Sequence, residues 1–323
     1  GHEGIGVFLK TWHPEYLPCS WREERRDAMR VAAHLDIPFM TLDLEKEYKE
    51  GVADRMIAEY EKGRTPNPDV LCNKEVKFGA FLAFAKKRGG SLATGHYARI
   101  EKEKGRAHLL AGKDPEKDQS YFLWMVKGED LNDVLFPVGD LTKKEVRVLA
   151  KEFGLPNAAK KDSQGICFLG KVSLEEFLGH HVVLEEGDVL NEKGETIGRH
   201  KGSPLYTLGQ RHGFEVRVGA PSPFYVVAKD ADAKTITVAH APSPSQLKER
   251  IHLREENWIG EISEGSCEVR LRYRESLRKA RLVEDKGHMV VHLDEGTLVP
   301  LGQSLVAYRR ERLLGGGIID SAS

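Results

Sequence analysis

The sequence predicts an α/β fold: a doubly wound parallel-sheet domain followed by a small β-rich central domain and a C-terminal β-barrel. In the first half, short apolar strands alternate with amphipathic helices, which is typical of a parallel sheet with crossover helices. After about residue 180, helical periodicity gives way to short β-rich runs separated by turn residues. The 323 residues exceed what one small core needs. We place the domains at residues 1–178, 179–237 and 238–323.

Apolar spacing predicts the elements of the first domain. Strands are expected at residues 5–9, 37–44 and 92–100, the first of them buried, and helices at 52–62 and 76–88. Further helices are expected after Ser20, Thr142 and Ser173, where capping-box or related N-cap patterns occur. The chain opens as if at the end of a helix, so we expect that a strand, loop and helix of about 30 residues belong before it.

Composition limits the class of protein. Lysine and arginine total 49 against 50 acidic residues, a net charge of -1, so any RNA-binding surface must be local. No apolar run approaches the roughly 18 residues of a membrane span. The first residues lack a basic and apolar leader, and we therefore expect a reducing compartment.

The cysteines must be interpreted one at a time. They stand at positions 19, 72, 167 and 267, and none is close enough to another for a zinc-knuckle, so we expect no bound metal. Cys267 is interpreted as a core-facing strand residue, whereas Cys19 stays unassigned.

The segment 63–75 carries the strongest local signal. Two prolines fix the backbone around Asn67, which stiffens a loop that would present Asp69 and Cys72. Lys74 and the start of the following helix could lower the pKa of the thiol, and Asp69 could exchange protons with it. The alternative is a surface turn followed by a packing cysteine.

A second cysteine lies in segment 160–170. Gly165 permits close backbone approach, and the neighbouring lysines favour a thiolate or persulfide at Cys167. The alternative is a structural cysteine in a short strand. If Cys167 meets Cys72, one thiol can carry a transferable sulfur while the other attacks it, leaving a disulfide. A purely stabilising disulfide is the third possibility.

Three further segments are candidates for ligand contacts. Residues 93–97 follow a strand at the end where α/β sheets bind ligands, so Gly95 could admit a nucleotide. Residues 117–121 form a polar loop or a helix cap before an apolar helix at 121–126. In the strand 267–274 the alternating residues 270, 272 and 274 are arginines, which would line one face for phosphates or simply be solvated.

Six segments together resemble the tRNA-specific 2-thiouridylases in order and spacing. They are residues 63–78, 93–97, 117–121, 161–170, 206–213 and 315–318. The resemblance covers essentially the whole chain. Its most specific parts are residues 64–69 with Cys72, and residues 162–168.

The resemblance implies an ATP-pyrophosphatase-type first domain and a tRNA-binding C-terminal barrel. In that family ATP, with Mg²⁺, adenylates the 2-oxygen of the wobble uridine, and a persulfide sulfur then replaces this oxygen. Adenylation is chemically necessary because that oxygen is a poor leaving group. The implied partners are tRNA and a persulfide donor or relay protein. We expect a monomer away from membranes, in bacterial cytoplasm or alternatively in mitochondria.

The resemblance also assigns roles by position. Cys167 matches the persulfide-bearing cysteine and Cys72 the nucleophile that ends in a disulfide with it. Asp69 matches the general acid/base, and Asn67 and Pro68 accompany it at the target base. Positions that match nucleotide contacts are Leu9 and Gly95. Positions that match tRNA contacts are His96, Lys117, Asp118, Gln119, Arg272, Tyr273 and Gln303.

One departure from the family pattern concerns the phosphate-binding loop. The family begins with a Ser-Gly-Gly-Val-Asp-Ser-like loop, and nothing in this sequence matches it. We therefore expect that the chain as it stands retains a tRNA surface without ATP-dependent thiolation. Two alternatives stay open: an ATP-pyrophosphatase-family enzyme acting on a small metabolite, and an RNA-binding remnant.

Overall fold

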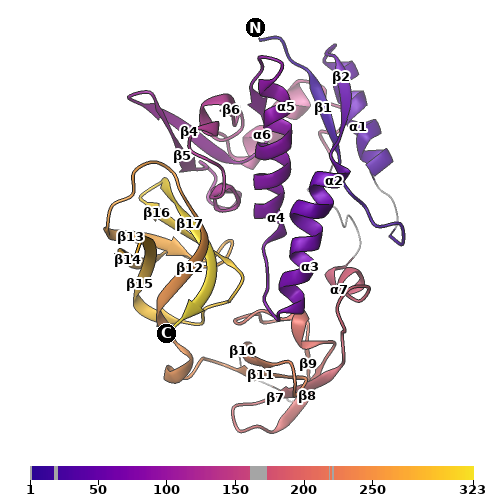
Figure 1. Ribbon diagram of the computed structural model, residues 1–323. Coiled ribbons are helices and arrows are strands. Elements are labelled where there is room, and N and C mark those ends of the chain that lie inside the picture. The colour runs from indigo at the N-terminus through magenta and orange to yellow at the C-terminus, as the bar shows by residue number, and fades with distance from the viewer. Residues whose placement is uncertain (1, 18–20, 161–172, 218, 220–221) are drawn as a thin grey trace. The chain divides into compact units, whose positions relative to one another are not determined.

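The computed structural model describes residues 2–17, 21–160, 173–217, 219 and 222–323 (Figure 1). The chain divides into two compact units. The first unit comprises Gly1–Asp54 and Pro68–Leu174, and the second comprises Arg55–Asn67 and Glu175–Ser323. A short segment from the first half of the chain therefore belongs to the unit that contains the C-terminal half.

The first unit is built on parallel strand pairs, which confirms the α/β prediction. Strand β1 (Gly6–Lys10) pairs in parallel with β2 (Phe39–Asp43), and helix α1 (Trp21–His34) connects them. Strand β1 is half-buried along its length rather than buried as expected. Helix α1 is rich in charged side chains and buries only Ala32, which accounts for this partial cover.

The two helices around the proline-containing segment begin earlier than predicted. The first runs through α2 (Glu45–Tyr48), the π-helical η1 (Lys49–Ala53) and α3 (Asp54–Glu61). The second runs through α4 (Pro68–Leu71), the π-helical η2 (Cys72–Phe81) and α5 (Leu82–Lys86). Proline is well tolerated at the first helical position, where no backbone N–H is needed, so Pro68 begins the helix instead of extending the loop.

The expected strand at 92–100 is two strands. Strand β3 (Leu92–Ala93) pairs in parallel with β6 (Val134–Leu135), whereas β4 (Ala98–Glu103) forms an antiparallel hairpin with β5 (Arg106–Ala111). Short 3₁₀ turns η3 (Ser120–Leu123) and η4 (Asp130–Asp133) lie between β5 and β6.

Two further helices start where the N-cap patterns placed them. Helix α6 (Lys143–Glu152) begins with the predicted capping box: the backbone N–H of Thr142 donates to Glu145 at 2.6 Å, and the N–H of Glu145 donates to the Thr142 hydroxyl at 3.3 Å. Helix α7 (Leu174–Leu178) follows Ser173. These starts depend on neighbouring residues alone, which is why the sequence predicts them well.

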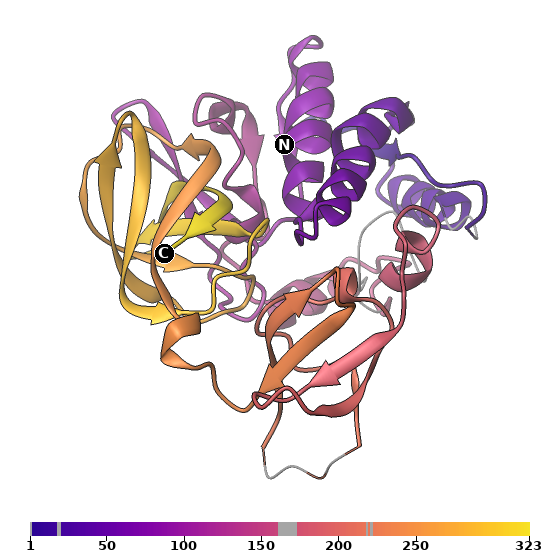
Figure 2. The same cartoon turned by 60° about the horizontal axis from the view of Figure 1, so that its bottom comes forward.

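The central part of the second unit is a five-stranded sheet in the order β10-β11-β7-β8-β9. Its strands lie in the pink-to-orange part of the ribbon in Figure 2. Its elements are β7 (Gly187–Leu190), β8 (Thr196–His200), η5 (Ser203–Leu205), β9 (Glu215–Val216), β10 (Tyr225–Asp230) and β11 (Thr235–Ala239). The β11–β7 pairing is parallel, and the other pairings are antiparallel. Its core contains Val189, Tyr206 and Val226.

The C-terminal part of the second unit is a closed barrel. Its elements are η6 (Pro244–Gln246), β12 (Lys248–Trp258), β13 (Gly265–Arg270), β14 (Arg278–Asp285), β15 (His288–Thr297), β16 (Ser304–Arg309) and β17 (Arg312–Ala322). The strand order β12-β15-β14-β13-β16-β17 closes through the pairing of β12 with β17. Cys267 lies in the barrel core with 7% of its surface exposed, as predicted.

The predicted arginine-lined strand is wrong in its second half. Strand β13 ends at Arg270, and Arg272 and Arg274 lie in the turn beyond it, where Arg274 has φ of 63°. The Arg270 guanidinium lies 5.5 Å from the centroid of the Tyr308 ring, whereas that of Arg274 lies 5.2 Å from Tyr273. Alternation ends with the strand, so the three arginines do not share a face.

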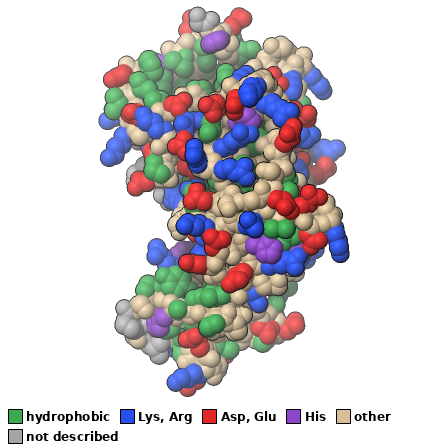
Figure 3. All heavy atoms as spheres, turned by 90° about the vertical axis from the view of Figure 1, so that its left-hand side faces the viewer, with side chains coloured by type: hydrophobic (Ala, Val, Ile, Leu, Met, Phe, Trp, Pro, Cys, Tyr) green, Lys and Arg blue, Asp and Glu red, His purple; other side chains and the backbone are tan. Residues whose placement is uncertain are grey.

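The surface agrees with a balanced composition. On the face shown in Figure 3, acidic and basic side chains are interspersed. Within the part of the chain that the structure describes, no helix has the length and apolar character to cross a bilayer.

Candidate functional site

Asn67, Asp69 and Cys72 lie at the start of one helix. Asn67 immediately precedes α4, Asp69 is in its first turn, and Cys72 opens the π-helical stretch that continues it. Asp69 and Cys72 are three residues apart, which separates them by about one helical turn. Cys72 is 4% exposed and Pro68 is buried, so the helix start is well packed.

The earlier start of this helix corrects the expected environment of Cys72. The helix N-terminus is at Pro68 and not near Val76, so Cys72 lies beyond the first turn, where the dipole effect has declined. Lys74 is two residues from Cys72 and therefore faces another side of the helix, where its ammonium contacts Glu75 at 3.4 Å. The influence of Lys74 on the thiol stays a prediction.

Asn73 is a buried polar residue that the sequence analysis missed. Its side chain is 2% exposed, and its amide donates to the carbonyl of Phe122 at 2.9 Å. Its Oδ1 has no hydrogen-bond partner among the described residues. Asn73 thus ties the Cys72 helix to η3, and it places an unused acceptor beside the cysteine in the sequence. A polar residue next to a candidate nucleophile is a weak signal without this burial.

His96 lies where the sequence placed it, beyond the carboxyl end of a parallel strand, but it is buried. Its ring packs against Phe78 and Phe136, with centroids 5.6 and 5.8 Å away. Its Nδ1 lies 2.7 Å from the Thr94 hydroxyl and its Nε2 lies 3.5 Å from the Lys77 ammonium. Burial, with a contribution from the Lys77 charge, lowers the pKa of His96 to about 3. The imidazole is therefore neutral at physiological pH.

Residues 117–121 fold back onto the segment that contains His96. The Asp118 carboxylate, 4% exposed, accepts hydrogen bonds from the backbone N–H groups of Gly112 and Ser120, each at 3.0 Å. Gln119 accepts a 3.0 Å bond from the N–H of Tyr97. Lys117 is half-buried. Asp118 and Gln119 therefore have defined structural partners. The helix expected at 121–126 is only the 3₁₀ turn η3, and its N-cap residue Gln119 makes no side-chain capping bond.

In the second unit, Gln303 and Arg272 contact backbone carbonyls of other segments. Gln303 donates its side-chain amide to the carbonyl of Thr65 at 2.6 Å and to that of Pro66 at 3.3 Å. Arg272 donates to the carbonyl of Leu208, in the segment 206–213. The structure thus brings Gln303 to the segment that ends at Asn67. Gln303 is 238 positions from Thr65 and 237 from Pro66, so the sequence gives no sign of this contact.

The remaining predicted residues are less constrained. Leu9 lies in β1 and is half-buried. Gly95 is exposed, and no described atom lies within 4 Å of the place a Cβ would take, so its backbone is open to a ligand. Tyr273 is half-buried beside Arg274. Cys167 and Cys19 lie outside the described residues, and so do residues 162–168 of the second motif.

Comparison with protein families assigns the three parts of the chain. Residues 1–171 match the model described as "tRNA methyl transferase HUP domain", and residues 175–240 match "tRNA methyl transferase PRC-barrel domain". Residues 248–319 match "Aminomethyltransferase beta-barrel domain". Fold and matches together define a HUP-class enzyme that carries a PRC-type barrel and a C-terminal β-barrel.

Curated relatives make the family explicit. The chain is 40% identical to the tRNA-specific 2-thiouridylase MnmA of Flavobacterium johnsoniae, over 99% of this chain and 94% of the relative. The enzyme of the same name from Bacillus subtilis is 40% identical, over 99% of this chain and 89% of the relative. That of Chlamydia abortus is 39% identical, over 98% and 90%. The chain belongs to the tRNA-specific 2-thiouridylase family.

Proposed function

We propose that this chain, when it is joined to the phosphate-binding loop of its family, converts the wobble uridine of tRNA to 2-thiouridine, using ATP and the cysteines Cys72 and Cys167. The observation that carries the proposal is the match of about 40% identity over nearly the whole chain. The position of Asp69 and Cys72, about one turn apart in a helix that begins at Pro68, supports it. An acid/base and a nucleophile one turn apart can act on the same substrate atom.

The reaction balances in three steps. The uridine 2-oxygen attacks the α-phosphate of ATP, which releases pyrophosphate and makes the oxygen a leaving group. The terminal sulfur of a Cys167 persulfide then adds to C2 and AMP departs, which leaves Cys167 joined to the base through two sulfurs. The Cys72 thiolate attacks the Cys167 sulfur, releases 2-thiouridine and forms a Cys72–Cys167 disulfide, which a cellular thiol must reduce before the next turnover.

The residues around the helix start are assigned to the target base. Asp69 exchanges a proton with the uridine or the thiol, and Asn67 and Pro68 hold the base at the helix N-terminus. Backbone N–H groups at that end of a helix favour an electron-rich partner such as a carbonyl oxygen, which supports this placement. Burial at Cys72 also limits competing water.

The other contacts are divided between ATP and RNA. Leu9 and Gly95 are proposed to contact the nucleotide, and the open backbone at Gly95 supports this. The proposed tRNA contacts are His96, Lys117, Asp118, Gln119, Arg272, Tyr273 and Gln303. Since several of these already bind protein groups, we propose that some of them shape the RNA surface rather than touch RNA themselves.

The proposal extends to domains, ions and partners. We propose domain boundaries at residues 178 and 237, close to the breaks between the matched family models. Mg²⁺ would accompany the ATP phosphates, and we assign it no step, because the described residues hold no group of three potential metal ligands.

A persulfide relay protein supplies the sulfur to a monomeric enzyme. The compartment is that of the tRNA, which is the cytoplasm for a bacterial chain.

Cysteine variants of the chain joined to the family's phosphate-binding loop test the proposal. In cells lacking their own 2-thiouridylase, Cys72→Ser and Cys167→Ser should each abolish 2-thiouridine in tRNA nucleosides measured by mass spectrometry, while Cys267→Ser retains it. With persulfide and ATP supplied, Cys72→Ser should accumulate a thiol-sensitive covalent adduct with tRNA, and Cys167→Ser should not. Retained thiolation in either variant, with only a lower melting temperature, would mean that the pair is a structural disulfide.

The competing functions predict different substrates. An enzyme acting on a small metabolite would hydrolyse ATP without tRNA, and an RNA-binding remnant would bind tRNA without ATP turnover. Measuring tRNA-dependent pyrophosphate release separates these possibilities from thiolation.

A further inference from the structure

Residues 63–67, which lead into the Pro68 helix, are held by β-structure far along the chain. The backbone N–H of Thr65 donates to the carbonyl of Leu301 at 3.2 Å, and its carbonyl accepts from Gln303. The Lys229 ammonium donates to the carbonyl of Gly63 at 3.1 Å. All these residues belong to the second unit, so the segment that ends at Asn67 is fixed to the β-rich half of the protein.

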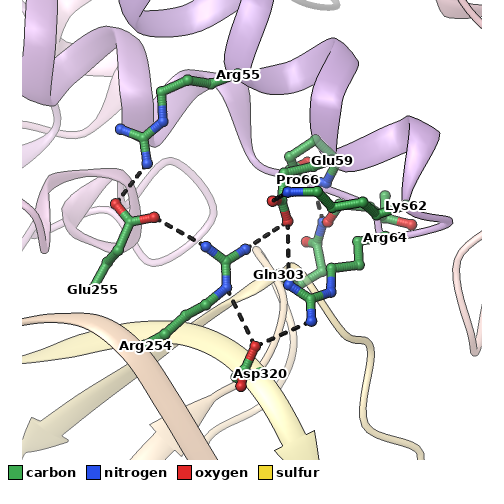
Figure 4. Close-up of polar contacts among 10 residues, drawn as sticks. Arg55, Glu59, Lys62, Arg64, Pro66, Arg254, Glu255, Gln303 and Asp320 are labelled. Carbon is green, nitrogen blue, oxygen red and sulfur yellow. Dashed lines mark hydrogen bonds and ion pairs between the residues drawn. The ribbon is translucent and has the colours of Figure 1, made fainter.

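A network of ion pairs joins helix α3, just before this segment, to the barrel (Figure 4). The Arg254 guanidinium reaches the carboxylates of Glu59 at 2.5 Å, Glu255 at 3.0 Å and Asp320 at 3.5 Å. Arg55 contacts Glu255 at 2.6 Å. Arg254 is thus the centre of the network, and its planar, forked donors suit several carboxylates at once.

The segment itself is part of this network. Arg64 reaches Asp320 at 3.2 Å and Glu59 at 3.9 Å. The side chain of Glu59 is only 15% exposed, so these pairs are less screened than ordinary surface ion pairs. Three arginines and three carboxylates alternate, and the ammonium of Lys62 lies 3.8 Å from Glu59 at the exposed edge of the network.

The backbone of β12 is bent to build the network. Consecutive side chains in a regular strand point to opposite faces, yet Arg254 and Glu255 both reach helix α3. The β12–β17 register shifts between Arg254 and Asn257, and Glu255 has φ of 50°, which non-glycine residues rarely adopt. A bulge re-aims side chains in this way, and such irregularities are frequent next to functional sites.

We propose that Arg254 and Glu59 are positioning residues for thiolation. By locking helix α3 to the barrel, they hold residues 63–67 in place, and with them Asn67, at the position from which it meets the target uridine. The proposal deepens the assignment of Asn67 to the target base and rests on it. The barrel then serves two roles: it binds tRNA, and it sets the geometry of the segment that receives the base.

The test compares Arg254→Gln and Glu59→Gln with Arg250→Gln. Arg250 lies on the same strand and, among the described residues, makes one ion pair, with Asp285 at 3.0 Å, so it is a matched control. Because small displacements of substrate-positioning groups cost up to about 100-fold in rate, each lock variant should lower the kcat of thiolation by about tenfold or more. The affinity of the two lock variants for tRNA should equal that of the parent chain. Arg250→Gln should keep both the kcat and the tRNA affinity of the parent chain.

Two further measurements separate positioning from simple loss of stability. Hydrogen exchange of the Thr65 amide should be faster in both lock variants and unchanged in Arg250→Gln. Arg254→Lys should restore the melting temperature more than kcat, because a single ammonium cannot hold three carboxylates. The double variant should be no slower than the slower single variant, because both changes break the same lock.

The possible results distinguish failure of the lock from failure of the proposed function. Normal kcat and normal Thr65 exchange in Arg254→Gln would overturn the lock, and weaker tRNA binding at unchanged kcat would make Arg254 an RNA contact instead. If Arg254→Gln does not fold, Glu59→Gln gives the same readouts with the barrel intact. If the chain joined to the family's phosphate-binding loop, with no other change, does not thiolate tRNA, the proposed function fails, and Thr65 exchange alone decides whether the lock exists.

Discussion

The side-chain carbonyl of Gln119 accepts a 3.0 Å hydrogen bond from the backbone N–H of Tyr97. This bond ties together two segments that the sequence singled out separately as RNA contacts. Tyr97 is 7% exposed, so its N–H has little access to water as an alternative partner. Gln119 therefore has a structural role, whether or not it also touches tRNA.

Removing this acceptor should destabilise the protein. Gln119→Ala leaves the Tyr97 N–H without its partner, which costs about 1–3 kcal/mol of unfolding free energy. Urea denaturation checks this, with Glu116→Ala, at an exposed neighbouring position, as the control. Unchanged stability with weaker tRNA binding would show instead that Gln119 acts only at the RNA surface.

Cys267 should be inert and dispensable for the reaction. Burial raises the pKa of its thiol to about 11, so little reactive thiolate exists near neutral pH. Cys267→Ala should keep thiolation and cost about 1 kcal/mol through lost packing in the barrel core. Mass spectrometry after brief alkylation of the folded protein should find Cys267 unmodified, and rapid labelling there would contradict its burial.

His96 should make stability fall as the solution becomes acidic. Its pKa is about 3 in the folded chain, against an ordinary value of 6.5, so the unfolded chain takes up a proton first as pH falls. Above about pH 6.5 the titration of His96 costs no stability. Between about pH 6.5 and pH 3 the unfolding free energy falls progressively, and the loss is about 2 kcal/mol at pH 5.

His96→Gln removes this titration. The difference in unfolding free energy between about pH 7.5 and pH 5 should be about 2 kcal/mol smaller in the variant than in the parent chain. His212→Gln, at an exposed position, should behave like the parent chain. Equal pH dependence in His96→Gln and the parent would mean that His96 is protonated normally.

Gly302 allows the barrel to approach the segment that ends at Asn67. It has φ of 87°, and a Cβ there would lie 2.9 Å from Cβ of Arg64 and 3.0 Å from the backbone nitrogen of Thr65. Gly287 has nearly the same φ, 84°, but open space around it. The two glycines therefore separate backbone strain from steric contact.

Gly302→Ala should destabilise the chain more than Gly287→Ala. The extra cost is that of overpacking, about 1–3 kcal/mol, and thiolation should slow as residues 63–67 move. Melting curves and single-turnover thiolation of both variants check this. Equal effects of the two substitutions would mean that the close approach at Gly302 has no consequence.

The sequence predicted correctly those structural features that depend on residues a few positions apart in the chain. The Thr142 and Glu145 capping box is an example, because the two residues that make it are three positions apart. The Cys267 strand succeeded for the same reason, since alternation alone places the cysteine inside. The Pro68 helix start was missed because two prolines with asparagine and aspartate favour a loop as well as a helix N-terminus.

The order and spacing of short motifs predicted the family, the class of reaction and the candidate cysteines. This was possible because each motif is a contiguous stretch of the chain. The tertiary structure alone shows which other residues of the chain hold those motifs in place. Glu59 and Arg254 are 195 positions apart, and nothing in either neighbourhood indicates the other. Their meeting depends on barrel closure and on a bulge in β12, which are properties of many residues acting together. Such long-range contacts follow from topology, whereas caps and strand alternation follow from backbone geometry over a few residues.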